Sequence, residues 1–345
     1  MANKNPSLTI CIPTYNRPEK IRKTIINLSV MKNIDHVKIL IIDNCSPVPV
    51  LEIYNKLDVK LTGLKIMRNP INIGIAANIM RSIEYAETDW VWLLSDDDIA
   101  LKNSLEIIIE DLCQIESSLY STVLLKYSTR LMSDSSSIGT INQQVYIKTL
   151  NELFNVFEKS EFFPSFLFMS SQVINKNLFL RYYIKALANP RICNIYPVFP
   201  LLINNQAGVY ISDKMICRCG TLGKWPSDTW FPGIVYRDML KEFKSFYFIS
   251  SRTLRTIAHK WLYLKLKSIL VICGILSIHG FEKGFIRHLF RDYYDLIFPK
   301  TLRFILFPVY FLFLFMIHHH KLLNRLMKYY KKYNEIKDSV INIDY

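Results

Sequence analysis

The feature that most constrains the fold is an alternation of short apolar runs with amphipathic segments over the first third of the chain. The apolar runs are short enough to be strands, and we expect five of them, at Leu8–Ile12, Val37–Ile42, Leu64–Met67, Trp90–Leu94 and Thr122–Tyr127. The segments between them carry helical periodicity, and we expect helices at Pro18–Val30, Ile75–Ala86 and Ser104–Glu116. Strands separated by helices favour a mostly parallel sheet flanked by helices, so the sequence predicts an α/β fold.

Polar residues follow four of these strands at the point where each one ends. They lie at Pro13–Arg17, Asp43–Ser46, Arg68–Gly74 and Ser95–Asp98. Open α/β sheets bind ligands beyond the carboxyl ends of their strands. We therefore expect the functional site at this edge of the sheet.

The triplet Asp96, Asp97 and Asp98 is the sharpest of these features. Three adjacent carboxylates repel one another, so keeping them ionised requires a compensating cation. Oxygen ligands favour Mg²⁺ or Mn²⁺, and an ion carried by a phosphate group takes only one or two protein carboxylates. Such an ion would neutralise charge on a departing nucleoside diphosphate. Helix capping is the alternative, because Asp also favours the first turn of a helix.

Two further positions suit a nucleotide, and each has a simpler explanation. Asp43 can accept hydrogen bonds from a base or a ribose, although an Asp after a strand is often a turn former. The segment Asn72-Ile73-Gly74 precedes a helix, where glycine allows close backbone approach and amide groups attract phosphate. A plain turn would explain that segment equally.

Four segments together carry a resemblance to a known family. In order and spacing, LTICIPTYNR, KILIIDNCS, NPINIGIAA and WVWLLSDDDIALKNSL resemble the family 2 glycosyltransferases, which have the GT-A fold. The resemblance covers roughly residues 7–112. The three Asp residues after WLLS look like those of O-antigen and capsule transferases of the abequosyltransferase-like type.

The resemblance implies roles for individual residues. The usual acidic motif is Asp-x-Asp-Asp before an aliphatic residue, so alignment on Ile99 places Ser95 at the first Asp, which is a departure from the pattern. Asp97 and Asp98 are then the ribose and metal candidates, with Asp98 favoured for Mn²⁺ or Mg²⁺. Asp43 is expected to face the base. The implied donor-binding set is Pro13, Thr14, Tyr15, Arg17, Asp43, Asn72, Gly74, Asp96 and Asp97.

The catalytic base is harder to find. Inverting members of the family use an acidic residue roughly a hundred residues after the metal motif, but residues 188–203 contain no acid. A base must come within hydrogen-bond reach of the acceptor hydroxyl. Asp213 is the candidate among the nearest acids. Retaining chemistry, which needs no such base, is the alternative.

The end of the chain is basic and apolar. The chain has a net charge of +14, and residues 251–345 hold 16 Lys and Arg against 6 Asp and Glu. Phe304–Ile317 has no charged residue, but it is shorter than the ~20 residues of a spanning helix. We expect a helical tail bound to an anionic membrane surface. A buried core helix is the alternative. The polar first residues predict no signal peptide, which places the protein in the cytoplasm, peripheral on the inner face of the cell membrane.

These observations predict three regions: a donor-binding half at 1–112, an acceptor-binding half at 113–250, and the tail at 251–345. The expected partners are a nucleoside-diphosphate sugar, a lipid-linked oligosaccharide acceptor and a membrane, with no nucleic acid. A nucleotidyltransferase is one alternative, although the run PTYNRPEK lacks the glycine-rich loop that such enzymes normally show. A catalytically inactive homologue that binds membranes or nucleic acid is the other.

Overall fold

A computed structural model describes residues 7–116, 121–131, 137–139, 141–159, 163–190 and 192–219. The chain divides into two compact units, Met1–Leu222 and Gly223–Tyr345. All the described residues belong to the first unit. The predicted tail, including Phe304–Ile317, lies outside the described residues, as does the last part of the predicted acceptor-binding half.

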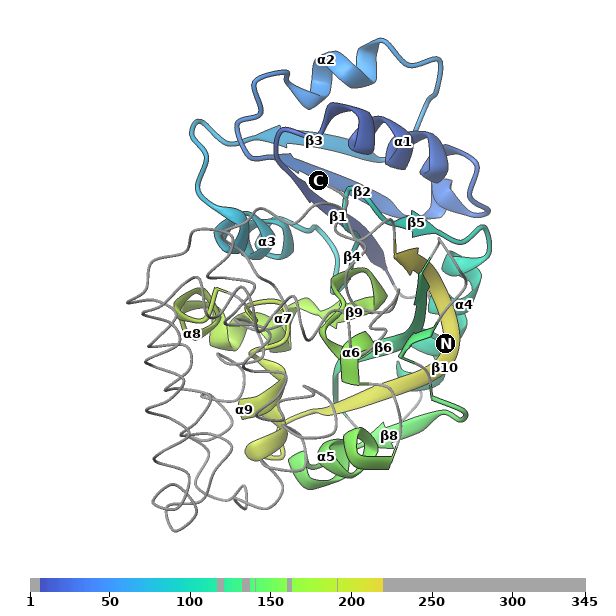
Figure 1. Ribbon diagram of the computed structural model, residues 1–345, viewed down its shortest axis with the longest axis vertical. Helices are drawn as coiled ribbons and strands as arrows, with labels where there is room; N and C mark the ends of the chain where they lie inside the picture. Colours follow the sequence, from blue (N-terminus) through green and yellow to red (C-terminus); the bar gives the residue numbers. More distant parts are fainter. Residues whose placement is uncertain are drawn as a thin grey trace, which may run out of the picture. The chain divides into compact units, whose positions relative to one another are not determined.

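The first half of the sheet confirms the predicted parallel arrangement. Four parallel strands lie in the order β3-β2-β1-β4. Their bounds are Leu8–Thr14 for β1, Lys38–Asp43 for β2, Leu64–Arg68 for β3 and Trp90–Leu93 for β4. The chain builds outward from β1 to β3 and then returns to the other side of β1 (Figure 1). The strand order therefore reverses between β1 and β4, which is where ligands bind in sheets of this type.

Helices cover both faces of these strands, as their apolar periodicity predicts. Helix α1 (Pro18–Ser29) and helix α4 (Ser104–Glu116) contribute to the core cluster that contains Ile10 and Ile12 of β1. Helix α3 (Ile75–Glu84) lies on the opposite face, where Cys11 Sγ donates to the Ser82 carbonyl at 3.1 Å. Alternate residues of β1 thus point to opposite layers. The short helix α2 (Val50–Asn55), which packs beside α1, was not predicted from the sequence.

The second half of the sheet is mixed, so the sheet as a whole is mostly but not wholly parallel. The order continues from β4 through β9 (Gln172–Asn175), β6 (Thr122–Leu131) and β10 (Gly208–Cys219) to β5 (Ile99–Ala100). Strand β9 is antiparallel to both β4 and β6, so the fifth predicted strand, now β6, does not pair with β4. The short strands β7 (Ser137–Gly139) and β8 (Val145–Ile147) pair with β6 and β10.

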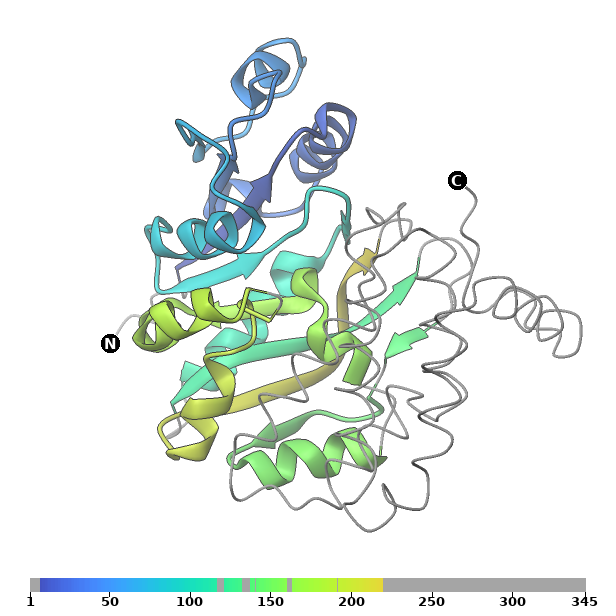
Figure 2. The ribbon, with the colours of Figure 1, turned by 60° about the vertical axis from the view of Figure 1, so that its left-hand side comes forward.

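Short helices fill the remainder of the described chain (Figure 2). Aromatic side chains join two of them, since the rings of Phe157 and Phe166 lie 5.1 Å apart in an edge-to-face arrangement. The 3-10 turn η2 (Met169–Ser171) leads into β9 and packs beside β4. The helices are α5 (Leu150–Lys159), α6 (Phe163–Leu167), α7 (Lys176–Phe179), α8 (Tyr183–Ala188) and α9 (Val198–Ile203), with 3-10 turns η1 (Ile34–His36) and η3 (Leu180–Tyr182).

Among the helices of the described residues, none combines the length and apolar character that crossing a membrane requires.

Candidate active site

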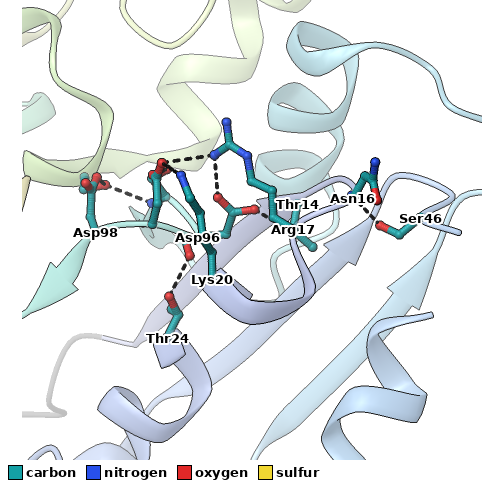
Figure 3. Close-up of polar contacts among 11 residues, drawn as sticks. Thr14, Asn16, Arg17, Lys20, Thr24, Ser46, Asp96 and Asp98 are labelled. Atoms are coloured by element: carbon teal, nitrogen blue, oxygen red, sulfur yellow. Dashed lines mark hydrogen bonds and ion pairs between the residues drawn. The ribbon is translucent and has the colours of Figure 1, made fainter. Parts of the chain in front are cut away.

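The Asp triplet lies at the reversal point of the strand order. It follows β4 and faces Thr14, the last residue of β1 (Figure 3). Thr14 Oγ1 donates to Asp96 Oδ2 at 2.5 Å, and Thr24 Oγ1 on α1 donates to the Asp96 carbonyl at 2.9 Å. The structure therefore brings the first predicted polar segment together with the fourth, although 82 residues separate Thr14 from Asp96.

Asp96 is the buried member that ties these segments together. Its residue is 3% exposed, and Arg17 Nη1 donates to Asp96 Oδ1 at 2.8 Å. Burial raises the pKa of Asp96, and the Arg17 charge with the Thr14 and Arg17 hydrogen bonds offsets only part of that rise. Both carboxylate oxygens thus contact the chain itself and hold Thr14 and Arg17 beside the triplet, and the role of Asp96 in donor binding stays a prediction.

Asp97 is the most accessible carboxylate of the triplet, with 23% of its side chain exposed. Ser95 Oγ donates to Oδ1 at 2.6 Å, and Lys20 Nζ and Arg17 Nη1 lie 2.9 Å and 3.2 Å from Oδ2. Burial would raise the pKa of Asp97, but the Ser95 hydrogen bond and the Lys20 and Arg17 charges outweigh it and lower that pKa. Asp97 is therefore ionised at neutral pH.

Asp98 is buried, with 5% of the residue exposed. Its Oδ2 accepts a hydrogen bond from Ser170 Oγ, which in turn accepts one from the Ser95 amide at 2.8 Å. The Ser170 carbonyl accepts from Trp92 Nε1 at 2.8 Å and from Cys217 Sγ at 3.1 Å. Ser170 thus joins both ends of the acidic motif to the core of the sheet.

Asp97 and Asp98 are the residues that would hold a metal ion. In the part of the chain that the structure describes, no three His, Cys, Asp or Glu side chains converge as a metal site would require. An ion carried by a diphosphate needs only one or two carboxylates, because phosphate and water supply its other ligands. The donor set fits such an ion, and metal binding at Asp97 and Asp98 stays a prediction.

Asp43 organises a second polar cluster at the end of β2. It is 1% exposed, and its carboxylate accepts from the Ser46 amide at 2.8 Å and the Val50 amide at 3.3 Å. Arg68 Nη1 lies 2.6 Å from Asp43 Oδ2, and Arg68 Nη2 donates to the Ser46 carbonyl at 2.8 Å. Asp43 therefore forms a turn, as one reading of the sequence proposed. Its predicted contact with a base is a separate role that these bonds do not test.

The predicted residues Asn72 and Gly74 form a braced turn before α3. Asn72 Oδ1 accepts from the Gly74 amide at 2.9 Å and from Asn44 Nδ2 at 2.8 Å. Gly74 has a φ of +83°, which favours glycine, and a Cβ atom at this position would meet no other atom within 4 Å. The turn places the amino end of α3 at the same sheet edge as Asn44, which follows Asp43.

The remaining residues of the predicted donor site border these two clusters. Pro13 is half-buried, and the Tyr15 side chain is exposed between β1 and α1. The Asn16 amide donates to Ser46 Oγ at 2.9 Å, which joins the loop after β1 to the loop after β2. Pro13 and Asp43 thus lie at the ends of the adjacent strands β1 and β2, and Tyr15 lies in the loop after β1.

Asp213, the predicted base, lies apart from the triplet along β10. Its side chain is exposed, in a stretch where the pairing of β10 with β6 shifts register. Strand β10 pairs with β5, which directly follows the triplet, through Cys217 and Ala100, and Cys217 is four residues further along the strand than Asp213. At about 3.3 Å per residue, Asp213 lies roughly 13 Å along the strand from that pair. Its role as a base stays a prediction.

Three residues of the site were not singled out from the sequence. Lys20 lies three positions after Arg17 at the start of a helix, and that spacing alone places both on one face. Arg68 ends β3 and could have been paired with Asp43 from the alignment of adjacent parallel strands. Ser170 carries no signal in the sequence, because its contact with Asp98 depends on the antiparallel insertion of β9.

Comparison with solved structures supports the fold. S. aureus TarS residues 1–349 in complex with UDP-GlcNAc is similar with a TM-score of 0.60 and 14% identity, over 97% of this chain and 95% of that one. A second S. aureus TarS 1–349 structure gives a TM-score of 0.57 and 13% identity, over 97% and 94%. At these identities the likeness concerns the fold alone.

Comparison of sequences identifies the family. Abequosyltransferase RfbV of Salmonella typhimurium (strain LT2) is 33% identical over 107 residues, which are 29% of this chain and 31% of that protein. The chain therefore matches about a third of the length of this curated relative. Residues 9–179 match the model of the family described as glycosyl transferase family 2. This match contains β1 to β4, the Asp triplet and Ser170, and the chain belongs to glycosyl transferase family 2.

Proposed function

We propose that the protein transfers a sugar from a nucleoside-diphosphate donor to a lipid-linked glycan during synthesis of a bacterial surface polysaccharide such as O-antigen or capsule. The observation that carries the proposal is the Asp triplet at the reversal of the strand order, held against Thr14 at 2.5 Å. Membership of family 2 supports it. So do the fold shared with TarS, which was solved with UDP-GlcNAc, and the sequence match to an abequosyltransferase.

The two polar clusters suggest how the donor lies. The nucleoside would occupy the loops after β1 and β2, with Tyr15 exposed beside it and Asp43 contacting the base. The diphosphate would lie toward Asp97, the most accessible carboxylate of the triplet. The amino end of α3, after Gly74, would add amide groups and a favourable dipole for an anion.

The proposed site promotes transfer by stabilising the negative charge of the leaving group. Departure of the sugar leaves negative charge on the nucleoside diphosphate, and a site that stabilises this charge lowers the barrier. A bound Mn²⁺ or Mg²⁺ would neutralise that charge, with Asp97 and Asp98 as its protein ligands. Arg17 adds a guanidinium that already lies within 3.2 Å of Asp97. If transfer inverts the configuration at the anomeric carbon, a carboxylate must accept the proton of the acceptor hydroxyl. Asp213 is the proposed base.

The lipid-linked acceptor and the membrane belong to the same proposal. The basic residues of 251–345 would attract an anionic membrane on its cytoplasmic face, and the apolar segment 304–317 would enter the interface. The full chain should then fractionate with membranes. High salt should release only part of it, because salt screens charge attraction but leaves apolar burial. A full-length protein that does not bind membranes at all at low salt without detergent would refute the membrane anchor and leave the proposed donor site unaffected.

The test of activity is donor cleavage. The purified full chain is incubated with a panel of sugar nucleotides and Mn²⁺ or Mg²⁺, and release of nucleoside diphosphate is measured. We expect release from one donor class, which Asp97→Asn abolishes and Asp35→Asn preserves, since Asp35 is exposed before the start of β2. An inactive homologue would bind a sugar nucleotide without releasing nucleoside diphosphate. A nucleotidyltransferase would cleave the sugar nucleotide only when pyrophosphate is added, and it would then release nucleoside triphosphate and sugar 1-phosphate.

A further inference from the structure

Two cations occupy the accessible oxygen of Asp97. Lys20 Nζ lies 2.9 Å and Arg17 Nη1 lies 3.2 Å from the same Oδ2, both from the first turn of α1 or the residue before it (Figure 3). The two differ in how firmly they are fixed. Arg17 also bonds the buried Asp96, whereas the described hydrogen bonds of Lys20 Nζ comprise the one to Asp97.

Both cations are also partly in solvent. The side chains of Lys20 and Arg17 are 39% and 44% exposed, so neither is locked in place by packing. Lysine carries a compact charge on a flexible stem and binds phosphate as a point charge. A divalent ion at Asp97 would lie within a few ångströms of the Lys20 ammonium and would be repelled by it. The ion and Lys20 therefore compete for one carboxylate.

We propose that Lys20 holds Asp97 while the site is empty and moves to the donor diphosphate when the donor binds. The inference rests on the proposed function, because it assumes that the diphosphate lies beside Asp97. A diphosphate offers Lys20 a new anionic partner and at the same time brings ligands for the ion. Metal and diphosphate should then bind cooperatively, with Lys20 opposing the ion alone and favouring the pair.

The test uses full-length wild type, Lys20→Met and two controls. Lys23→Met removes an exposed lysine from the same helix, and Lys20→Arg keeps the charge. Water-proton relaxation measures binding of Mn²⁺ alone, and calorimetry measures binding of inorganic pyrophosphate at fixed Mn²⁺. In both measurements the signal obtained with Asp97→Asn is subtracted from that of each protein, so that only binding at Asp97 is compared.

The inference predicts changes of opposite sign. In Lys20→Met, Mn²⁺ alone should bind about two- to fivefold more tightly, as expected when a half-exposed competing ion pair is removed. Pyrophosphate with Mn²⁺ should bind about tenfold more weakly, as expected when one charged hydrogen bond is lost. Lys23→Met and Lys20→Arg should resemble wild type in both measurements.

Other outcomes distinguish a failure of the Lys20 proposal from a failure of the proposed function. If wild type binds Mn²⁺ with pyrophosphate but Lys20→Met binds both probes as wild type does, the role of Lys20 is wrong and the proposed function stands. A fall in both affinities would also overturn it, because it would make Lys20 a structural support of the site. If wild type binds no pyrophosphate with Mn²⁺, the proposed donor site fails together with the inference.

Discussion

Ser170 offers a sharp test of how the acidic motif is built. Its hydroxyl donates to Asp98 and accepts the Ser95 amide at 2.8 Å, and the residue is fully buried. The neighbouring Ser171 is buried equally, yet its hydroxyl contacts only backbone carbonyls, those of Phe168 at 3.0 Å and Ser165 at 3.3 Å, among the described hydrogen bonds. Ser170→Ala and Ser171→Ala therefore remove the same atom at adjacent positions.

The structure gives different magnitudes for the two changes. Ser170→Ala removes a hydrogen bond to a charged group, worth about 1.5–3 kcal/mol, and leaves the partly buried Ser95 amide without its Ser170 partner at a cost of about 1–3 kcal/mol. Because neighbouring effects are not additive, we expect a total loss of about 2–5 kcal/mol in the free energy of unfolding. Ser171→Ala removes ordinary hydrogen bonds and should cost about 1 kcal/mol.

Two assays separate support of the fold from support of the site. Urea unfolding gives the stability of each variant, and calorimetry with Mn²⁺ gives the affinity for nucleoside diphosphate under conditions where each variant is folded. Under these conditions Ser170→Ala should still bind the nucleotide more weakly than wild type does, because Asp98 has lost its support. Ser171→Ala should bind the nucleotide as wild type does. Equal losses of stability with unchanged nucleotide affinity in both variants would refute the reasoning.

Three further substitutions probe individual carboxylates. Asp98→Asn should abolish transfer and leave the fold intact, because the ion loses a ligand; transfer at near wild-type rate with unchanged metal dependence would remove Asp98 from the site. Asp43→Ala should weaken nucleotide binding by about 1.5–3 kcal/mol, and unchanged affinity would limit Asp43 to its turn. Burial raises the pKa of Asp96, so Asp96 binds a proton more readily in the folded than in the unfolded state. The free energy of unfolding of wild type, measured relative to that of Asp96→Asn, should therefore fall as the pH rises from the ordinary Asp pKa of about 3.9 toward the raised pKa. Denaturation curves of the two proteins at each pH measure this difference, and a rise over that range would contradict the prediction.

The parallel half of the sheet was predictable because each of its strands is marked by the sequence of the strand itself and of the turn after it. The runs that became β1, β2 and β4 are largely apolar and buried, whereas β3 is only partly buried, and each of the four is followed by a polar turn. Parallel strands must also be joined by crossovers, so strand ends inevitably meet at one edge. The convergence of Thr14 with Asp96 follows from this rule.

The antiparallel half was not predictable because its pairings are long-range. Strand β9 has four residues, QVIN, and neither its length nor its pattern distinguishes it from the surrounding mixed segment. Its insertion between β4 and β6 is what carries Ser170 to Asp98. The competition of Lys20 with a metal ion likewise depends on side-chain positions, since the sequence shows only the spacing of two cations.

Nucleotide binding by the Asp triplet is the central requirement of the proposed function. Thermal unfolding of the full chain with each common nucleoside diphosphate and Mn²⁺ tests it, because a ligand that binds only the folded state stabilises it by about 2.7 kcal/mol at a hundred times its Kd. We predict that one base class raises the Tm of wild type and that Asp97→Asn loses this rise while its Tm without ligand stays close to that of wild type. A screen in which no nucleoside diphosphate raises the Tm, or in which Asp97→Asn responds as wild type does, would contradict the account.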